Sequence, residues 1–398
     1  MLPLALDSYT TDWLNLLVRW LHVIAGIAWI GSSFYFIALD YHLLPPKEER
    51  DAEKGVGGET WEIHGGGFYH VQKYRVSPDR LPEPLYWFKW EAYTTWLSGF
   101  ALLVVLYYVG ADTYLVDTSV ADIGATAAIA ISIGILALGW VVYDLVCRVL
   151  GKNELLLALV LLLFVAGIAY GASNLLSARA VYIQVGAMLG TMMAGNVLFV
   201  IIPGQRELLR AKKAGRSPDP AHGIRGKQRS VHNNYLTLPV VFTMISNHFP
   251  ITYGHAHSWL ILLALMVIGA WVRYFFNLRH KGRTVWAIPA SGAIAIALVA
   301  VWIRPDNAPT AGVQSAPRGT VGVGRAVFAS VGCGSCHTLA DAGATATIGP
   351  SLDEARPSRE LVIDRVQSGR GAMPSFKNQL SPDRIEAVAD YVSAVAGK

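Results

Sequence analysis

Two cysteines and a histidine near the end of the chain, in the segment Cys333-Gly-Ser-Cys336-His337, have the spacing that is typical of covalent haem attachment. In such a segment the two thiols form thioethers to the porphyrin, and the histidine that follows ligates the iron. The remaining cysteine, Cys147, lies in an apolar stretch and is interpreted as a small buried hydrophobic residue. The sequence therefore predicts one covalent haem c and no disulfide framework.

The residues around this motif predict a small helical domain. A helix is expected before the motif, with Gly324 and Phe328 on one face. A final helix is expected to begin with Ser381 as its N-cap and Pro382 as its first residue, the positions that these two residue types favour. Together these elements delimit a domain at residues 319–398.

This C-terminal segment resembles the class I cytochromes c over its whole length. The resemblance implies that His337 is the proximal ligand of the haem iron. It also implies that Met373, in the loop "GRGAMPSF", is the distal ligand, and the alternative for Met373 is a core methionine. Because both axial positions are then filled, the domain is expected to accept and carry electrons rather than to bind a substrate.

The rest of the chain has a membrane composition. Only 15% of the 398 residues are charged, and the mean hydropathy is +0.38. The predicted fold is all-α, a polytopic membrane helical bundle of about eight transmembrane helices with a C-terminal all-α class I cytochrome c domain. The first span is expected to be retained, because the residues before it lack the basic region and cleavage site of a signal peptide. The eight apolar runs of spanning length lie near residues 13–39, 91–110, 121–147, 154–173, 180–202, 232–250, 257–278 and 285–303.

Basic residues gather in every second connection, after the first, third, fifth and seventh runs. Since basic loops stay cytoplasmic, both termini and the haem domain are predicted to face outwards. Because c-type haem is attached on the outer side of the bacterial inner membrane, the expectation is a multi-pass protein of that membrane with both termini and the haem domain periplasmic. The Pro-, Gly- and Ala-rich residues 305–318 predict a flexible linker between a membrane domain at 1–304 and the haem domain. The net charge of +5 is therefore a topology signal, and no nucleic-acid partner is expected.

Polar residues in the spans form an outer and an inner layer, and intramembrane polar groups are functional hypotheses by default. In the outer layer His22 and His248 are the first-choice ligands of a haem b, with His257 in reserve, and Arg19 suits a propionate. The alternatives are copper at the same imidazoles, or histidines that only bond headgroups and loops. The inner layer consists of Glu91, Tyr143, Asp144, Asn196, His232, Asn233, Asn234 and Arg273.

The connection at residues 62–91 is dense in aromatic residues, histidine and glycine, as in "HGGGFYHVQKY". Aromatic faces, exposed backbone amides and cations are what a planar, polar, anionic heterocycle needs for binding. The alternative is an interfacial aromatic belt, which explains Trp87 and Trp90 but not the glycine-rich part.

Four phrases together resemble the bacterial membrane-bound, cytochrome c-linked urate oxidases, also called urate hydroxylases: "WLHVIAGIAWIGSSFYF", "HGGGFYHVQKYRVSPDRLPEPLYWFKWEAYTTWLSGF", "NNYLTLPVVFTMISNHFP" and "CGSCH". This resemblance covers essentially the whole chain. It implies conversion of urate and water to 5-hydroxyisourate without hydrogen peroxide. Electrons would pass to the C-terminal haem c, and from there to a terminal oxidase or a soluble cytochrome c.

The expected urate pocket lies in the membrane domain, capped by the 62–91 segment. Lys73 and Arg75 would bind the anion, with Arg273 facing them from the seventh span, and His70 or Glu91 would accept the proton released as water adds. The alternative pocket lies nearer the outer layer, among Arg19, Gln184 and His248. Two other readings stay open: a quinol-oxidising or general electron-transfer cytochrome without urate chemistry, and a copper or solute transporter with a fused carrier domain.

Overall fold

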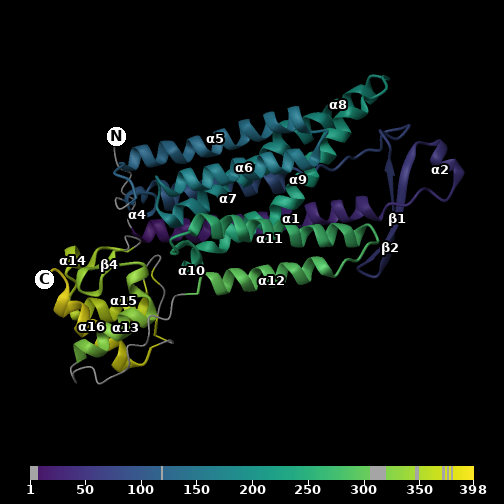
Figure 1. The fold of residues 1–398 in the computed structure, drawn as a ribbon. Helices are drawn as coiled ribbons and strands as arrows, with labels where there is room; N and C mark the ends of the chain where they lie inside the picture. The colour runs from purple at the N-terminus through teal and green to yellow at the C-terminus, as the bar shows by residue number, and fades with distance from the viewer. Residues whose placement is uncertain are drawn as a thin grey trace.

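The computed structural model describes residues 8–117, 120–304, 320–345, 349–369, 373, 376–377 and 380–398. The expected linker at residues 305–318 lies outside these ranges. Figure 1 shows long helices lying side by side, with a β hairpin at one end of the bundle and the C-terminal helical domain at the other. The first residues of α1 lie at the same end as the C-terminal domain.

The helices expected from the apolar runs are all present. They are α1 (Ser8–His42), α3 (Trp90–Leu102) with its π-helical continuation η1 (Leu103–Tyr108), α5 (Ala125–Leu150), α6 (Glu154–Ser173), α7 (Ala178–Gly195) continued through η2 (Asn196–Ile201) into α8 (Ile202–Lys213), α9 (Pro220–Ile245), α11 (Ser258–His280) and α12 (Ala287–Trp302). Short helical elements connect them: α2 (Glu49–Glu53), α4 (Ala111–Tyr114), η3 (Ser246–His248) and α10 (Pro250–Tyr253). The helical-bundle prediction is confirmed.

Within the described residues, five helical segments are long and apolar enough to cross a membrane: Trp13–His42, Ala125–Leu150, Glu154–Ser173, Ala178–Lys213 and Ser258–His280. The other three expected spans are helical as well, but they are not both long enough and apolar enough to cross a membrane by that criterion. The helix of α3 changes to π-helical geometry, α12 has 16 residues, and α9 carries many polar side chains. Polar α9 is therefore the helix to examine for function.

Helix α7 lies at the centre of the bundle, and most of its side chains are buried. Small residues let its neighbours approach closely, as is common between membrane helices. Gly186 lies against Thr243 of α9, and Gly139 of α5 lies against Met188. A side chain at either glycine would collide with its neighbour, so these contacts fix the positions of α5 and α9 on α7.

The connection after α1 contains a β hairpin, β1 (Val56–His64) and β2 (Gly67–Tyr74), which the all-α prediction did not include. The turn uses Gly65 and Gly66 at φ +57 and +82, the backbone geometry that glycine adopts without strain. Leu44 extends the sheet by pairing with Glu59 on the free edge of β1. The aromatic-rich segment is thus a folded element that projects beyond the helices (Figure 1).

The C-terminal domain has the expected helices. Its elements are α13 (Thr320–Val331), η4 (Cys333–Ser335), β3 (Thr338–Leu339), η5 (Ala340–Ala342), β4 (Ala344–Thr345), α14 (Leu352–Ala355), α15 (Arg359–Ser368) and α16 (Pro382–Val395). Helix α13 crosses α16 where Gly324 meets Ala387 and Tyr391, and Phe328 is buried beside that crossing. Ser381 is the N-cap of α16 as expected, although its side chain makes no capping hydrogen bond.

Candidate functional site

Cys333, Cys336 and His337 lie at or directly after the turn η4, between α13 and β3. The His337 Nδ1 lies 2.9 Å from the carbonyl oxygen of Pro350. A carbonyl only accepts hydrogen bonds, so Nδ1 carries the proton and the Nε2 lone pair is free for iron, the usual arrangement of a ligating histidine. Met373 is half-buried, and it packs against the hydrophobic core of the C-terminal domain, as Cys333 does. Burial raises the pKa of the Cys333 thiol to about 11. Together with Cys336, these residues fit a covalent haem c with two axial ligands.

His22 of α1 faces α3. Its Nδ1 lies 3.0 Å from the carbonyl oxygen of Thr95 and 3.1 Å from the hydroxyl oxygen of Ser98. The ring packs on Gly99, where a Cβ atom would lie 2.8 Å from the imidazole Cε1. The carbonyl again assigns the proton to Nδ1, which leaves Nε2 available as a ligand.

Among the other outer residues of the haem b hypothesis, Arg19 lies one turn before His22 on α1 and within electrostatic range of it. His248 is not on the span as expected, because α9 ends at Ile245 and His248 is exposed on the turn η3. His257 is exposed before α11, with its ring centroid 6.2 Å from that of Trp302. Arg19 donates to the amide oxygen of Asn15, one turn away on α1. Among the described hydrogen bonds and ring contacts, none joins His22 to His248 or His257.

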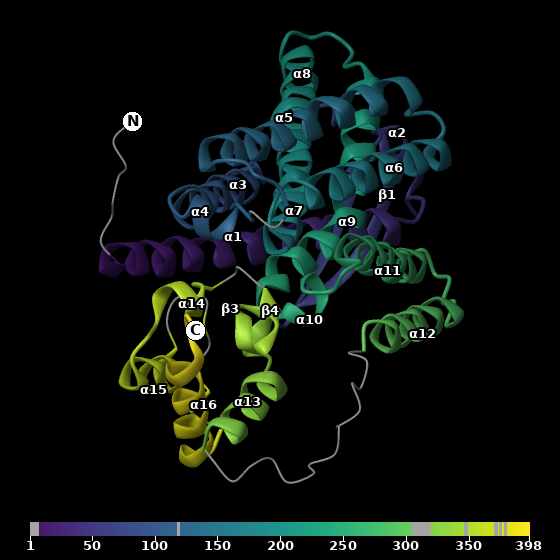
Figure 2. The same ribbon diagram turned by 60° about the vertical axis from the view of Figure 1, so that its left-hand side comes forward.

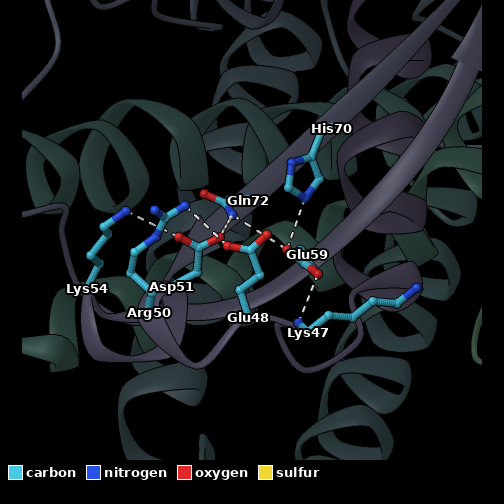
Figure 3. Close-up of polar contacts among 8 residues, drawn as sticks. All are labelled: Lys47, Glu48, Arg50, Asp51, Lys54, Glu59, His70 and Gln72. Atoms are coloured by element: carbon cyan, nitrogen blue, oxygen red, sulfur yellow. Dashed lines mark hydrogen bonds and ion pairs between the residues drawn. The ribbon is translucent and has the colours of Figure 1, made fainter.

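The hairpin places the expected inner residues on two different faces. His70 shares a face with Glu59 and Trp61. Its Nε2 lies 2.9 Å from a Glu59 carboxylate oxygen (Figure 3). Its ring stacks on that of Trp61, with the ring centroids 4.4 Å apart. The backbone N–H of Lys47 and the bond to His70 hold the pKa of Glu59 below its usual range. Lys73, an odd number of residues further along β2, lies on the opposite face and pairs with Asp40 of α1 at 2.5 Å. His70 and Lys73 therefore do not converge on one ligand.

Arg75 and Glu91 are also separate. Arg75 is exposed just after β2, and its side chain packs on Gly57. Glu91 lies in the first turn of α3, where a carboxylate is favoured by the helix dipole. One of its carboxylate oxygens, Oε2, is buried and has no hydrogen-bond partner among the described residues.

A cluster of buried polar side chains connects α9 and α11 near the hairpin end of the bundle. Asn234 of α9 accepts two hydrogen bonds at its Oδ1, from Arg273 Nε at 3.0 Å and from Asn277 Nδ2 at 2.9 Å. The ring of Phe34, from α1, lies 3.6 Å from the Arg273 guanidinium carbon. We call these four residues the polar seam. The sequence reading included Asn234 and Arg273 but missed Asn277, although its position four residues after Arg273 puts both on one helix face.

A second polar network lies on the other side of α9. Arg229 donates to Asp144 at 2.7 Å and to Asn196 at 3.2 Å, and Asn196 donates to the hydroxyl of Tyr143 at 2.8 Å. That hydroxyl lies 2.9 Å from His232 Nδ1. Asp144 and Arg229 also line a cleft of about 810 Å³ between α5, α8 and α9. The other cationic residues of this cleft are Arg148, Arg206, Arg210 and Arg225.

A membrane helical bundle joined to a domain with a CxxCH haem turn defines a membrane protein that carries electrons through a c-type haem. The family model described as "Urate oxidase N-terminal" matches residues 8–304, so the chain belongs to that family. The family model for the cbb3-type cytochrome c oxidase subunit III matches residues 319–392. The chain is thus an oxidoreductase-type fusion of a urate oxidase N-terminal domain and a cytochrome c domain.

Relatives of the C-terminal part are c-type cytochromes. Cytochrome c6 of Microcystis aeruginosa is 38% identical over 79 residues, which is 19% of this chain and 96% of that protein. Cytochrome c6 of Gloeothece citriformis is 37% identical over 90 residues, 22% of this chain and 81% of that protein. The crystal structure of the c-type cytochrome SorU from Sinorhizobium meliloti matches at 46% identity, covering 20% of this chain and 93% of that chain, with a TM-score of 0.19. The similarity to cytochromes c6 supports the covalent haem c.

Proposed function

We propose that the protein oxidises urate and passes the electrons to its own cytochrome domain. The balanced reaction is urate plus water to 5-hydroxyisourate, two protons and two electrons, with no formation of hydrogen peroxide. The observation that carries this proposal is the fusion, in one chain, of the urate oxidase N-terminal domain with a c-type cytochrome. The haem c, when bound through Cys333, Cys336, His337 and Met373, supplies an acceptor for one electron at a time.

The position of the cytochrome domain supports this role. It packs beside α10 at the end of the bundle opposite the hairpin (Figures 1 and 2). The haem-attachment residue Cys336 lies within electrostatic range of Tyr253 in α10. We propose that this end is periplasmic and the hairpin end cytoplasmic in a bacterial inner membrane, as the basic loops predict. The reduced cytochrome domain would then deliver electrons to a terminal oxidase or a soluble cytochrome c.

We also propose a haem b at His22, as a relay between the two ends. The bond from His22 Nδ1 to the Thr95 carbonyl gives the imidazole the tautomer and orientation of a ligand. Along α1, His22 lies about 18 Å from Phe34 of the polar seam by helical rise, toward the cytochrome domain. The hairpin and the cytochrome domain lie at opposite ends of the bundle (Figure 1), so a substrate bound toward the hairpin end would need a redox group between it and haem c. His248 remains the proposed second ligand, with His257 in reserve and Arg19 for a propionate.

The inner residues are proposed to act on urate from the cytoplasmic side. Lys73 and Arg75 would attract the anion toward the hairpin end of the bundle, and His70 or Glu91 would take up a released proton. Because the structure separates these side chains, they would act at different points of the path of the substrate and not around one ligand. Glu91 has the buried unpartnered carboxylate oxygen that favours this task, and the Glu59–His70 pair has the geometry of an oriented base. Replacing Glu91 by Gln is expected to lower kcat with little change in KM, and replacing Arg75 by Ala is expected to raise KM.

The test is reduction of the haem c by urate under anaerobic conditions, measured on the purified full-length protein by its absorbance bands. Urate should reduce the haem and yield 5-hydroxyisourate, and turnover in air should give no hydrogen peroxide. If a quinol reduces the haem and urate does not, the protein is a quinol-oxidising cytochrome and the proposal is overturned. A pyridine haemochrome spectrum of the same preparation counts the b and c haems.

A further inference from the structure

We infer that the polar seam formed by Asn234, Arg273, Asn277 and Phe34 is the binding site for the purine anion. This inference rests on the proposed function, because it assigns a place to that substrate. The sequence-based expectation put Lys73 and Arg75 on the hairpin segment and Arg273 opposite them on the seventh span; the inference keeps Arg273 and replaces the two hairpin cations by Asn234, Asn277 and Phe34. Arg273 is buried, with 4% of its surface exposed, and it contacts Asn234 of α9 and Phe34 of α1 from its place on α11.

The seam holds polar atoms that the described residues leave unsatisfied. Arg273 Nη2, Asn234 Nδ2 and Asn277 Oδ1 are all buried without a hydrogen-bond partner there. Six such atoms occur in the described part of the chain, and three of them belong to these three neighbouring, mutually bonded side chains. Buried polar groups without partners cost free energy, so a cluster of them indicates a site that a polar ligand completes.

The unsatisfied atoms match a planar purine anion in kind. Two are donors, on a guanidinium and an amide, and one is an amide oxygen that accepts. Urate offers carbonyl oxygens and ring N–H groups in one plane, together with a delocalised negative charge. Arg273 supplies the charge and a planar donor fork, and Phe34 supplies an aromatic face beside it. The same set would reject an apolar molecule of similar size, because that molecule would leave these atoms unpaired.

The hairpin closes the same three helices that build the seam. Glu62 of β1 bonds His42 of α1, and the other nitrogen of His42 lies 3.1 Å from His280 of α11. Asp40 of α1 pairs with Lys73 of β2 and also with Lys227 of α9, at 3.4 Å. These contacts lie about 10 Å beyond the Arg273 level by helical rise, at the cytoplasmic end of the proposed topology. The hairpin therefore covers the end of the polar seam and does not line it.

The arginine-lined cleft between α5, α8 and α9 is the competing anion site. Its buried cation, Arg229, is already bonded to Asp144 and Asn196. None of the side chains that line it carries a buried unpartnered polar atom. The buried arginine of this cleft therefore has its hydrogen-bond partners within the protein, whereas Arg273 leaves one buried nitrogen without a partner among the described residues. Arg206 of this cleft serves as the variant that tests the competing site.

The experiment measures urate binding separately from urate oxidation. Urate is titrated anaerobically into the full-length protein with its haem chemically reduced, so that no turnover occurs, and oxidation is measured in a parallel assay. Arg273→Met is expected to raise the urate Kd about 100-fold, and Asn277→Leu about tenfold. Arg279→Met, on the exposed side of the same helix, and Arg206→Met should leave the Kd unchanged.

Thermal unfolding without urate separates a binding role from a structural one. Asn277→Leu removes one hydrogen bond to Asn234 but also removes a buried unpaired acceptor, so its Tm should equal or exceed that of the wild type. A lower Tm with an unchanged Kd would show a structural role and overturn the inference. If the wild type oxidises urate while Arg273→Met keeps the wild-type Kd, the seam is also excluded and the proposed function stands. If the wild type neither binds nor oxidises urate, both the proposed function and this inference are wrong.

Discussion

Gly99→Ala tests the assignment of His22 as a haem ligand without touching the histidine. The new Cβ would lie 2.8 Å from the imidazole Cε1, so the ring must move by about 0.6 Å to reach an ordinary contact near 3.4 Å. That movement strains the bonds from Nδ1 to Thr95 and Ser98, at 3.0 and 3.1 Å. Overpacking of this kind costs about 1–3 kcal/mol, which corresponds to about 5- to 150-fold weaker binding of a haem held by that ring.

The assay is the ratio of b to c haem in a pyridine haemochrome spectrum of the purified variant. The ratio should fall relative to the wild type, while the covalent haem c stays bound. Gly26→Ala is the matched control, because it adds a methyl group to the same α1–α3 interface at an ordinary 3.9 Å from Thr95. If Gly99→Ala keeps the wild-type ratio and spectrum, or if both variants lose haem equally, His22 is not the ligand.

Three further predictions concern the haem c, the hairpin and the topology. Met373→Ala should lower the haem potential and abolish the sulfur-to-iron charge-transfer band, and an unchanged band in a redox titration would assign the sixth ligand elsewhere. The pKa of Glu59 is held low mainly by the backbone N–H of Lys47. The Glu59 carboxylate therefore contributes fully to hairpin stability above the pKa of an unfolded glutamate, about 4.3. This contribution is lost as the pH falls through the lower pKa of the folded state. Hydrogen exchange of the hairpin should accelerate over that acid range, and Glu59→Gln should remove the dependence. A reporter fused after Lys398 should be active outside the cell membrane and one in the 204–230 loop inside; the reverse result would contradict the charge asymmetry.

The covalent haem c could be predicted from the sequence because the chemistry of its attachment is local. The two thiols and the imidazole lie within five residues, and one turn brings them together whatever the rest of the chain does. The bond from His337 to Pro350 was not readable. It joins residues 13 positions apart across a loop, and no periodic pattern encodes such a contact.

The β hairpin carried a sequence signal that the all-α reading passed over. From Glu59 to His64 and from Gly67 to Gln72 the pairs lie in register around a glycine-rich turn, and glycine pairs between aromatic runs favour a two-residue turn. Once the strands are known, the two-residue period places His70 and Lys73 on opposite faces. Their expected convergence in one pocket took no account of strand pairing in this segment.

The sequence by itself determined the membrane helices, the alternation of basic connections and the haem turn. Each of these follows from composition or spacing over a few turns of chain. Only the tertiary structure decided which intramembrane polar residues meet: Asn234 with Arg273 and Asn277, and Arg229 with Asp144. The physical reason is that helical periodicity fixes which residues share a face of one helix, whereas the rotation of that helix against its neighbours is set by packing contacts such as Gly186 on Thr243, far apart in the chain.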